Sequence, residues 1–271
     1  MNLQILPLKL RDTDLVMELN RAGFSDTIYP LTIFSSEKYG DYLEATLSIP
    51  ENLRRKKVYG AYFEDQLLGY SEWTIEEDGL HLQNISVLPS CRGLNIGKKL
   101  LIQHGYQLMK IHRKTKIVLD VFEENISAIK WYESCGFEKE SSNYWYVSEQ
   151  PKTKRLDNPT VENYPQAEAV HLAYGFSELS VQTFKGKYQV TRLNENLYRM
   201  TDSNTYQNQD LLYLLKRLDR KRQLLVISEK PNRSEAELQG ISCRMSLHLK
   251  NMLKYMYFKS DLGMGGKLHG L

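Results

Sequence analysis

The 271-residue chain has few cysteines, little net charge and no long apolar run. Its three cysteines are scattered and odd in number, which excludes a disulfide framework and a cysteine-based metal cluster. The formal net charge of +3 is too small to indicate a nucleic-acid or anionic-membrane partner. No apolar stretch approaches the length of a membrane span, and the N-terminal sequence lacks the features of a secretion signal. We therefore expect a cytoplasmic protein with no nucleic acid and no membrane among its partners.

The composition is that of a globular protein with room for two domains. Hydrophobic residues make up 41% of the chain and charged residues 25%, and the length suffices for a well-buried core. The stretch from Pro151 to Pro165 is polar, contains three prolines and has no periodicity, so it predicts a linker. We expect a first domain over residues 1–150, a linker over 151–165, and a second, smaller α+β domain over 166–271.

One stretch in the first part predicts an anion site. Residues 80–87 alternate between apolar and polar side chains, which indicates a strand. The chain then passes through a turn that contains Arg92, Gly93 and Gly97 and enters a leucine-rich helical pattern. A turn between a strand and a helix N-terminus attracts anions, because free backbone N–H groups and the helix dipole both point at it. An ordinary strand–turn–helix corner is the plain alternative.

Three phosphate-binding motifs compete for this turn. A nucleotide P-loop places four residues between its glycines, but here three separate Gly93 from Gly97, and Lys99 stands where a hydroxyl should follow Lys98. The glycine spacing of a dinucleotide loop is absent. The run Arg92-Gly93-Leu94-Asn95-Ile96-Gly97 resembles the acetyl-CoA pyrophosphate loop of the GNAT superfamily, the acyl-CoA-dependent N-acetyltransferases. Asn95 replaces the family's middle glycine, and asparagine is the non-glycine residue that best tolerates a left-handed backbone.

A second stretch carries the other half of the resemblance. Residues 125–137 read N-x-x-A-x-x-x-Y-x-x-x-G-F, with Asn125 placed to cap a short helix and Gly136 placed to end it. This pattern closely resembles the other acetyl-CoA motif of GNAT proteins. The two motifs follow each other in the family's order, which is far more specific than either alone.

The element order agrees with that family. The patterns predict a strand in residues 3–10, helices near 12–21 and 36–48, a hairpin of 58–63 with 67–75, and strands at 80–87, 116–122 and 137–147. The resemblance therefore implies a GNAT fold for residues 1–150, a mixed and mostly antiparallel sheet flanked by helices. In the second part of the chain, the sequence patterns predict a weak strand at 172–176, a hairpin at 188–200, a helix at 211–218 and strands at 224–228 and 241–249. This order does not repeat both motifs, and a degenerate duplication stays open.

The resemblance implies acetyl-CoA as cosubstrate and direct transfer of the acetyl group to an amine. No set of His, Cys, Asp or Glu residues has the spacing of metal ligands, so we expect no metal ion. The strand before the loop would pair with the pantetheine arm where a bulge makes the sheet splay, and the loop N–H groups would hold the pyrophosphate. The residues that it assigns to the cofactor are Ile85, Ser86, Val87, Arg92, Gly93, Leu94, Asn95, Ile96, Gly97, Lys98 and Asn125. Tyr132 would protonate the leaving CoA thiolate as a general acid.

The acceptor side is less defined. An attacking amine must lose a proton, so a general base is expected. Many GNAT proteins carry a glutamate on the strand before the loop; the matching position here is His81, and Glu72 on the neighbouring strand is the second candidate. The aromatic residues between positions 24 and 34 predict an acceptor pocket with Tyr29 and Phe34 in its wall, although core packing explains them equally well.

Two functions from different classes follow. The first is an N-acetyltransferase for a small-molecule, peptide or protein amine. The alternative is a non-catalytic acyl-CoA-binding sensor that acts through the C-terminal domain. Tyr132 and the Arg92/Gly97 framework favour the enzyme, whereas the histidine at 81 and the asparagine at 95 favour the sensor. A homodimer is one assembly that the sequence leaves open. The basic run of residues 54–57 predicts a solvated turn.

Overall fold

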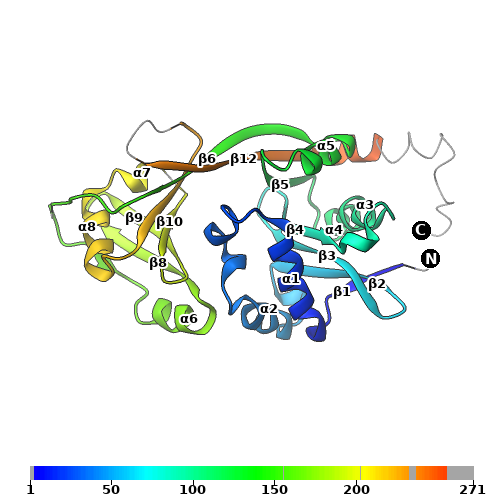
Figure 1. Cartoon of the computed structure of the whole chain (residues 1–271), viewed down its shortest axis with the longest axis horizontal. Coiled ribbons are helices and arrows are strands. Elements are labelled where there is room, and N and C mark those ends of the chain that lie inside the picture. Colours follow the sequence, from blue (N-terminus) through cyan, green and yellow to red (C-terminus); the bar gives the residue numbers. More distant parts are fainter. Residues whose placement is uncertain (1–2, 155, 202, 232–235, 255–271) are drawn as a thin grey trace. The chain divides into compact units, whose positions relative to one another are not determined.

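The computed structural model describes residues 3–154, 156–201, 203–231 and 236–254. The strands and helices of the first half, shown from blue to green in Figure 1, are β1 Gln4–Pro7, α1 Thr13–Gly23, α2 Tyr39–Ser48, β2 Lys56–Phe63, β3 Gln66–Ile75, β4 Leu80–Val87, α3 Ile96–Lys98, α4 Gly105–Ile111, β5 Lys116–Phe122, α5 Ile126–Ser134 and β6 Glu138–Ser148. Those of the second half are β7 Thr160–Val161, α6 Gln166–Tyr174, β8 Phe176–Thr183, β9 Gly186–Leu193, β10 Leu197–Met200, α7 Ser203–Tyr206, α8 Gln209–Leu218, β11 Gln223–Ser228 and β12 Glu237–His248. A π-helical segment, η6 Lys99–His104, joins α3 to α4. Several connections contain short 3₁₀ turns, which are η1 Leu10–Asp12, η2 Tyr29–Leu31, η3 Ile33–Ser35, η4 Glu51–Leu53 and η5 Pro89–Cys91.

These elements form two compact units that do not follow chain order. The first unit contains residues 1–12, 49–141 and 243–271, and the second contains residues 13–48 and 142–242. Helices α1 and α2 therefore belong to the unit that is built mainly from the second half of the chain. Strands β6 and β12 are each divided between the units, because the limits fall inside them. The division expected at residues 151–165 stays a prediction about domains; within the described part of that stretch, β7 is the regular element.

The first unit is a mixed sheet with the strand order β1-β2-β3-β4-β5-β12. Strands β1 to β4 are antiparallel neighbours, and β4 and β5 are parallel. Trp73 of β3 is fully buried in its core, and a Cβ at Gly105 of α4 would lie 3.1 Å from the Trp73 ring, so the helix lies close against the sheet. The C-terminal strand contributes Cys243, Met245 and Leu247 to this same core.

The second unit repeats this strand order with its own elements. Its order is β7-β8-β9-β10-β11-β6, in which β7 to β10 are antiparallel neighbours and β10 and β11 are parallel. A helix, α8, connects the two parallel strands, as α3 and α4 connect β4 to β5. Its core is formed by α8 leucines, Ala167 of α6 and the inward side chains of β8 to β11. Each unit thus completes its sheet with a strand, β12 or β6, that the chain supplies from its other half.

Most of the predicted elements are present, and one prediction is wrong. The strand predicted at residues 80–87 and the strand predicted at 116–122 coincide with β4 and β5. Residues 172–174, predicted to begin a weak strand, instead form the last turn of α6. Gly175 then ends that helix with a φ of 74°, and the strand begins at Phe176. The short apolar run was too brief to separate a helix end from a strand.

The contribution of β12 to the core of the first unit predicts that substitutions in this strand lower the stability of the fold. Leu247 is fully buried, and its Cδ1 lies 3.4 Å from where a Cβ on Gly136 would stand. Leu247→Ala is expected to lower the free energy of unfolding by about 2–5 kcal/mol, because it leaves a cavity in the core. Leu238, on the same strand but 47% exposed, is the matched control, and Leu238→Ala is expected to change stability by less than about 0.5 kcal/mol. Urea titration measures both, and equal effects would contradict the placement of Leu247.

Candidate functional site

The candidate site begins where the pairing of β4 is interrupted. Glu72 pairs with Asn84 and Trp73 with Leu82, so Gln83 bulges out of β4 without a partner on β3. On its other edge, β4 pairs with β5 from Leu80 to Leu82, and this pairing ends at Leu82 and Leu119. Residues 84–87 therefore present backbone polar groups along a strand edge that β5 no longer covers. The resemblance to GNAT proteins implied a bulge and a separation of strands at this place.

The turn after β4 has the backbone that the glycine-rich pattern requires. Gly93 and Asn95 both adopt left-handed conformations, with φ angles of 82° and 60°. The expectation that Asn95 takes over the role of a glycine is confirmed in this respect. Helix α3 begins at Ile96, whose side chain is buried, whereas Arg92 to Asn95 are exposed. The turn thus places exposed residues at the start of a helical run, where backbone N–H groups lack partners within the helix.

Helix α5 brings the second motif against the first. Asn125 caps the helix, because its Oδ1 accepts a hydrogen bond from the backbone N–H of Ala128 at 3.2 Å. Gly136 ends it with a φ of 91°. A Cβ at Gly97 would lie 3.3 Å from the ring of Trp131 and 3.8 Å from Val87. The end of β4, the turn and α5 therefore meet at Gly97.

Tyr132 follows Trp131 on this helix and is 8% exposed. Its ring lies 5.0 Å from that of Trp131 and 5.7 Å from that of Phe137. Burial raises the pKa of the Tyr132 hydroxyl well above its ordinary value, and the nearby Cys135 raises it further. A raised pKa keeps the hydroxyl protonated at neutral pH, so that it can donate a proton.

His81 lies in the paired part of β4, before the bulge. Its Nδ1 is 3.2 Å from Oε1 of Glu76, and its Nε2 is 3.2 Å from Oδ2 of Asp120. Arg244 of β12 holds the same aspartate with two hydrogen bonds of 2.7 and 3.1 Å. Burial opposes the ionisation of Asp120, but the hydrogen bonds from His81 and Arg244 outweigh it and lower the pKa of that carboxyl. Both ring nitrogens of His81 thus already face a carboxylate.

Glu72 lies at the bulge itself, directly opposite Asn84. The residue is fully buried, and Lys56 of β2 forms an ion pair with its carboxylate. Trp73 and Ser71, which hydrogen-bond to each other at 2.9 Å, point to the other face of β3. Of the two candidate bases, Glu72 is the one beside the splayed part of β4.

Tyr29 and Phe34 belong to an aromatic cluster in the second unit. The Tyr29 hydroxyl donates a hydrogen bond of 2.8 Å to the backbone oxygen of Phe34, and the Arg21 guanidinium lies 4.8 Å from the Tyr29 ring centre. Phe34 stacks on Phe24 at 5.7 Å and meets Tyr39 edge-on at 5.1 Å. The aromatic density of this loop is thus used in packing, which leaves its predicted role at the acceptor as a proposal.

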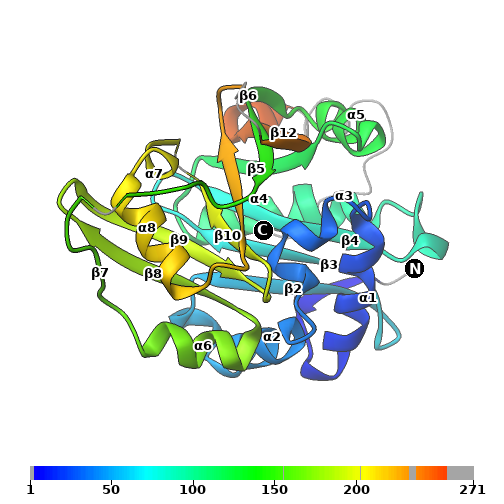
Figure 2. The same cartoon turned by 60° about the vertical axis from the view of Figure 1, so that its left-hand side comes forward.

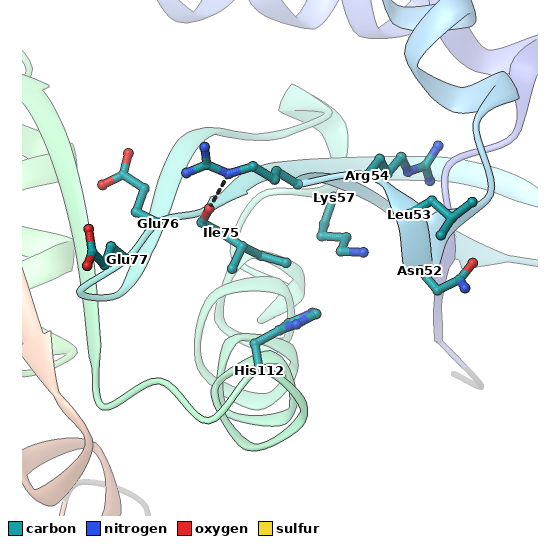
Figure 3. A pocket seen from close by; sticks show the side chains of 9 residues that line it. Asn52, Leu53, Arg54, Lys57, Ile75, Glu76, Glu77 and His112 are labelled. Carbon is teal, nitrogen blue, oxygen red and sulfur yellow. Dashed lines mark hydrogen bonds between the residues drawn. The ribbon is translucent and has the colours of Figure 1, made fainter.

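A further hollow lies elsewhere in the first unit. It encloses about 530 Å³ and is lined by Asn52, Leu53, Arg54, Arg55, Lys57, Ile75, Glu76, Glu77 and His112 (Figure 3). None of the predicted site residues lines it. Arg54 and Lys57 are 9% and 3% exposed, so the prediction that this basic run is a solvated turn is wrong for these two residues. Burial lowers the pKa of Lys57, which donates a hydrogen bond to the backbone oxygen of Glu51.

Among the residues that the structure describes, no group of three or more His, Cys, Asp or Glu side chains could hold a metal ion. No helix of those residues is both long and apolar enough to cross a membrane.

Comparison with known proteins decides the family. The model of the acetyltransferase (GNAT) family matches residues 26–137. Spermine/spermidine N(1)-acetyltransferase of Bacillus subtilis (strain 168) is 30% identical over 137 residues, which are 45% of this chain and 84% of that relative. The chain belongs to the GNAT acetyltransferase family. The probable spermine N(1)-acetyltransferase of Bacillus subtilis subsp. natto (strain BEST195) matches to the same extent. This GNAT protein is thus an acyltransferase, and nothing in the comparisons supports the alternative of a non-catalytic sensor.

Solved structures extend the likeness over the whole fold. A tandem GNAT protein from the clavulanic acid biosynthesis pathway covers 92% of this chain and 99% of its own, with a TM-score of 0.62 and 11% identity. A putative acetyltransferase from Pyrococcus horikoshii covers 92% of this chain and 90% of its own, with a TM-score of 0.61 and 14% identity. These likenesses show the GNAT fold, and the matching strand orders of the two units agree with a tandem arrangement.

Some residues around the site were not singled out from the sequence. Trp131 lies inside the second motif, yet its contact with Gly97 joins positions far apart in the chain. Lys56 was read as part of a charge run, and its pairing with Glu72 depends on the register of β2 with β3. Alternation along a strand shows that Lys56 and Glu72 share a face only when the register of β2 with β3 is given.

The left-handed backbone at Asn95 generates a test with CoA as the probe. Asn95→Val is expected to weaken CoA binding about tenfold to a hundredfold, because a β-branched residue is strained at a φ of 60°. Asn95→Gly should stay within about threefold of the original affinity, since glycine adopts this conformation freely. Isothermal titration calorimetry measures both. Equal affinities for the two variants would contradict a left-handed requirement at this position.

Proposed function

We propose that this GNAT protein transfers an acetyl group from acetyl-CoA directly to an amine. The observation that carries the proposal is the open edge of β4 next to an exposed turn with two left-handed residues. An extended pantetheine arm carries amide groups, and the edge at Ile85, Ser86 and Val87 supplies the complementary backbone groups. The N–H groups of residues 92–98 then receive the pyrophosphate at a helix start.

Asn125 and Tyr132 complete the donor side of this proposal. The capping bond uses Oδ1 of Asn125, and among the described residues no acceptor engages its Nδ2, which can therefore donate to the pantetheine. In the reaction the amine nitrogen bonds to the thioester carbon, the carbon–sulfur bond breaks, and the sulfur leaves as a thiolate. Tyr132 gives that thiolate its proton, because its hydroxyl is protonated at neutral pH.

Glu72 is our choice for the group that removes the proton from the amine, directly or through water. It lies at the bulge, on the strand that neighbours the open edge. The Glu72 carboxylate already binds one alkylammonium group, that of Lys56. An acceptor amine is also an alkylammonium ion before it loses its proton. His81 has both ring nitrogens engaged by Glu76 and Asp120, so it suits a structural clamp better than a base.

The acceptor is an amine, and spermine and spermidine are the first compounds to assay, because the relatives are named for them. We place the acceptor wall in the segment that carries Tyr29 and Phe34. The Tyr29 ring already has the Arg21 guanidinium at 4.8 Å, a geometry in which an aromatic face attracts a cation. A peptide or protein amine is the other acceptor class within this proposal.

The general-acid assignment is tested by Tyr132→Phe. The variant keeps the ring but removes the proton donor, so kcat is expected to fall by about 10²–10⁴ with little change in CoA affinity. Release of free thiol from acetyl-CoA in the presence of spermine measures turnover. Tyr198→Phe is the matched control, because Tyr198 is also buried, with a pKa raised to about 12, but lies in the core of the second unit. Undiminished turnover in Tyr132→Phe would remove the assignment.

The two candidate bases are separated by Glu72→Gln and His81→Gln. Both substitutions keep the approximate shape and remove the ionisable group. We expect kcat/KM for the amine to fall by about 10²–10³ in Glu72→Gln and by less than about fivefold in His81→Gln. Unfolding curves check that each variant is folded, because Glu72 is buried in an ion pair. The reverse order of effects would assign the base to His81.

A further inference from the structure

The segment that carries Tyr29 and Phe34 is fastened to the second half of the chain. Ser36 Oγ donates a hydrogen bond of 2.7 Å to the backbone oxygen of Tyr174, and Lys38 Nζ donates one of 2.7 Å to that of Leu172. Both oxygens belong to the last turn of α6, where carbonyl groups lack partners within the helix. A cation is also favoured at a helix C-terminus. The segment thus supplies hydrogen-bond donors to the backbone oxygens at the C-terminal end of α6.

Gly175 makes this contact possible. With a φ of 74°, it turns the chain from α6 into β8, and a Cβ at this position would lie 2.3 Å from Ser36 Oγ. Asn194, in the turn between β9 and β10, completes the arrangement. Its backbone N–H donates to the Gly175 oxygen at 2.7 Å, and its Nδ2 donates to Ser35 Oγ at 3.0 Å. We call the contacts of Ser35, Ser36, Gly175 and Asn194 the interlock.

Aromatic packing continues the interlock along α2. Tyr42 of α2 meets Tyr174 at 5.6 Å and Phe176 at 5.0 Å, in both cases edge-on. Tyr39 lies 6.4 Å from Phe176 and 5.1 Å from Phe34. Figures 1 and 2 both show α2 beside α6, as these contacts require. A chain of rings therefore leads from Phe34 to β8, the first long strand of the second half.

We propose that the second half of the chain is a positioning element for the acceptor, which it holds through the interlock. This inference rests on the proposed function, because it takes the segment with Tyr29 and Phe34 as the acceptor wall. The donor motifs lie in the first unit, and the interlock lies wholly in the second. Loosening the interlock therefore changes the response to the amine and leaves the response to acetyl-CoA unchanged. Ser36, Gly175 and Asn194 are positioning residues and not catalytic ones.

The first experiment tests the interlock without any activity. Gly175→Ala places a methyl group against Ser36 Oγ, and we expect backbone amides of residues 24–48 to exchange hydrogen about tenfold faster or more. Gly186→Ala is the matched control: its φ of 132° is also strained for alanine, but no atom lies within 4 Å of the new Cβ. In the double variant Ser36→Ala/Gly175→Ala the nearest Ser36 atom is Cβ at 3.4 Å, an ordinary contact. Exchange should then move back toward that of Ser36→Ala alone, and the excess that remains measures the strain of alanine at a φ of 74°.

The second experiment uses spermine and acetyl-CoA as the two substrates. Gly175→Ala is expected to raise KM for spermine about tenfold or more while CoA affinity stays within about twofold, and Gly186→Ala should change neither. This split supports the inference, because a general loss of folding would affect both substrates. A proportional change in both substrates, or no change in either, would overturn it.

Failure of the proposed function has a different signature. If the unsubstituted protein binds CoA but releases no thiol with spermine, the proposed acceptor is wrong, and the exchange experiment alone decides the interlock. Selective acceleration in residues 24–48 that Ser36→Ala relieves supports the positioning of this segment by the second half. Unchanged exchange in Gly175→Ala overturns it, whatever the activity.

Discussion

The donor site depends on one constraint, the end of pairing between β4 and β5 at Leu82 and Leu119. Because the strands separate there, β4 retains an open edge, and residues 92–95 of the turn that follows are exposed. The corresponding parallel strands of the second unit, β10 and β11, do not separate in this way. All four residues of β10 pair with β11, and residues 201–208, which lead on to α8, contain neither glycine nor arginine nor lysine. The turn to which we assign the cofactor pyrophosphate thus has no counterpart of similar composition after β10.

The same strand orders link the two halves of the sequence across its polar connection. Each sheet is completed by a strand from the other half of the sequence, and the buried Met245 and Leu247 belong to the core of the first unit. A fragment that ended at residue 150 would leave that core without these side chains. Composition and proline content locate a connection between segments. They do not reveal which segments fold together, because that depends on contacts distant in sequence.

Features that depend on neighbouring residues could be predicted from the sequence, whereas features that depend on contacts distant in the chain could not. The turn geometry at Gly93 and Asn95, the cap at Asn125 and the left-handed Gly136 are local, and each follows from the residue types and their spacing. The strand β4 was predicted for the same reason. The ion pair of Glu72 with Lys56 and the clamp on His81 need the register of neighbouring strands, which one sequence does not provide. The strand predicted at 172–176 is wrong in its first three residues, which end α6. Gly175, which ends that helix, lies against Ser36, a residue far away in the chain.

The aromatic loop posed a choice between packing and binding, and the two roles are compatible. A wall that selects an acceptor must be held within a fraction of an ångström, and side chains locked by their neighbours provide that rigidity. Phe34, at 8% exposed, is fixed by Phe24 and Tyr39, and the Tyr39 ring contacts that of Phe176 in turn. The donor loop has its own support in Trp131 and Val87. Since the two supports lie in different units, our proposal assigns acceptor selection to the second half and acetyl-CoA binding to the first unit, so that each could change without the other.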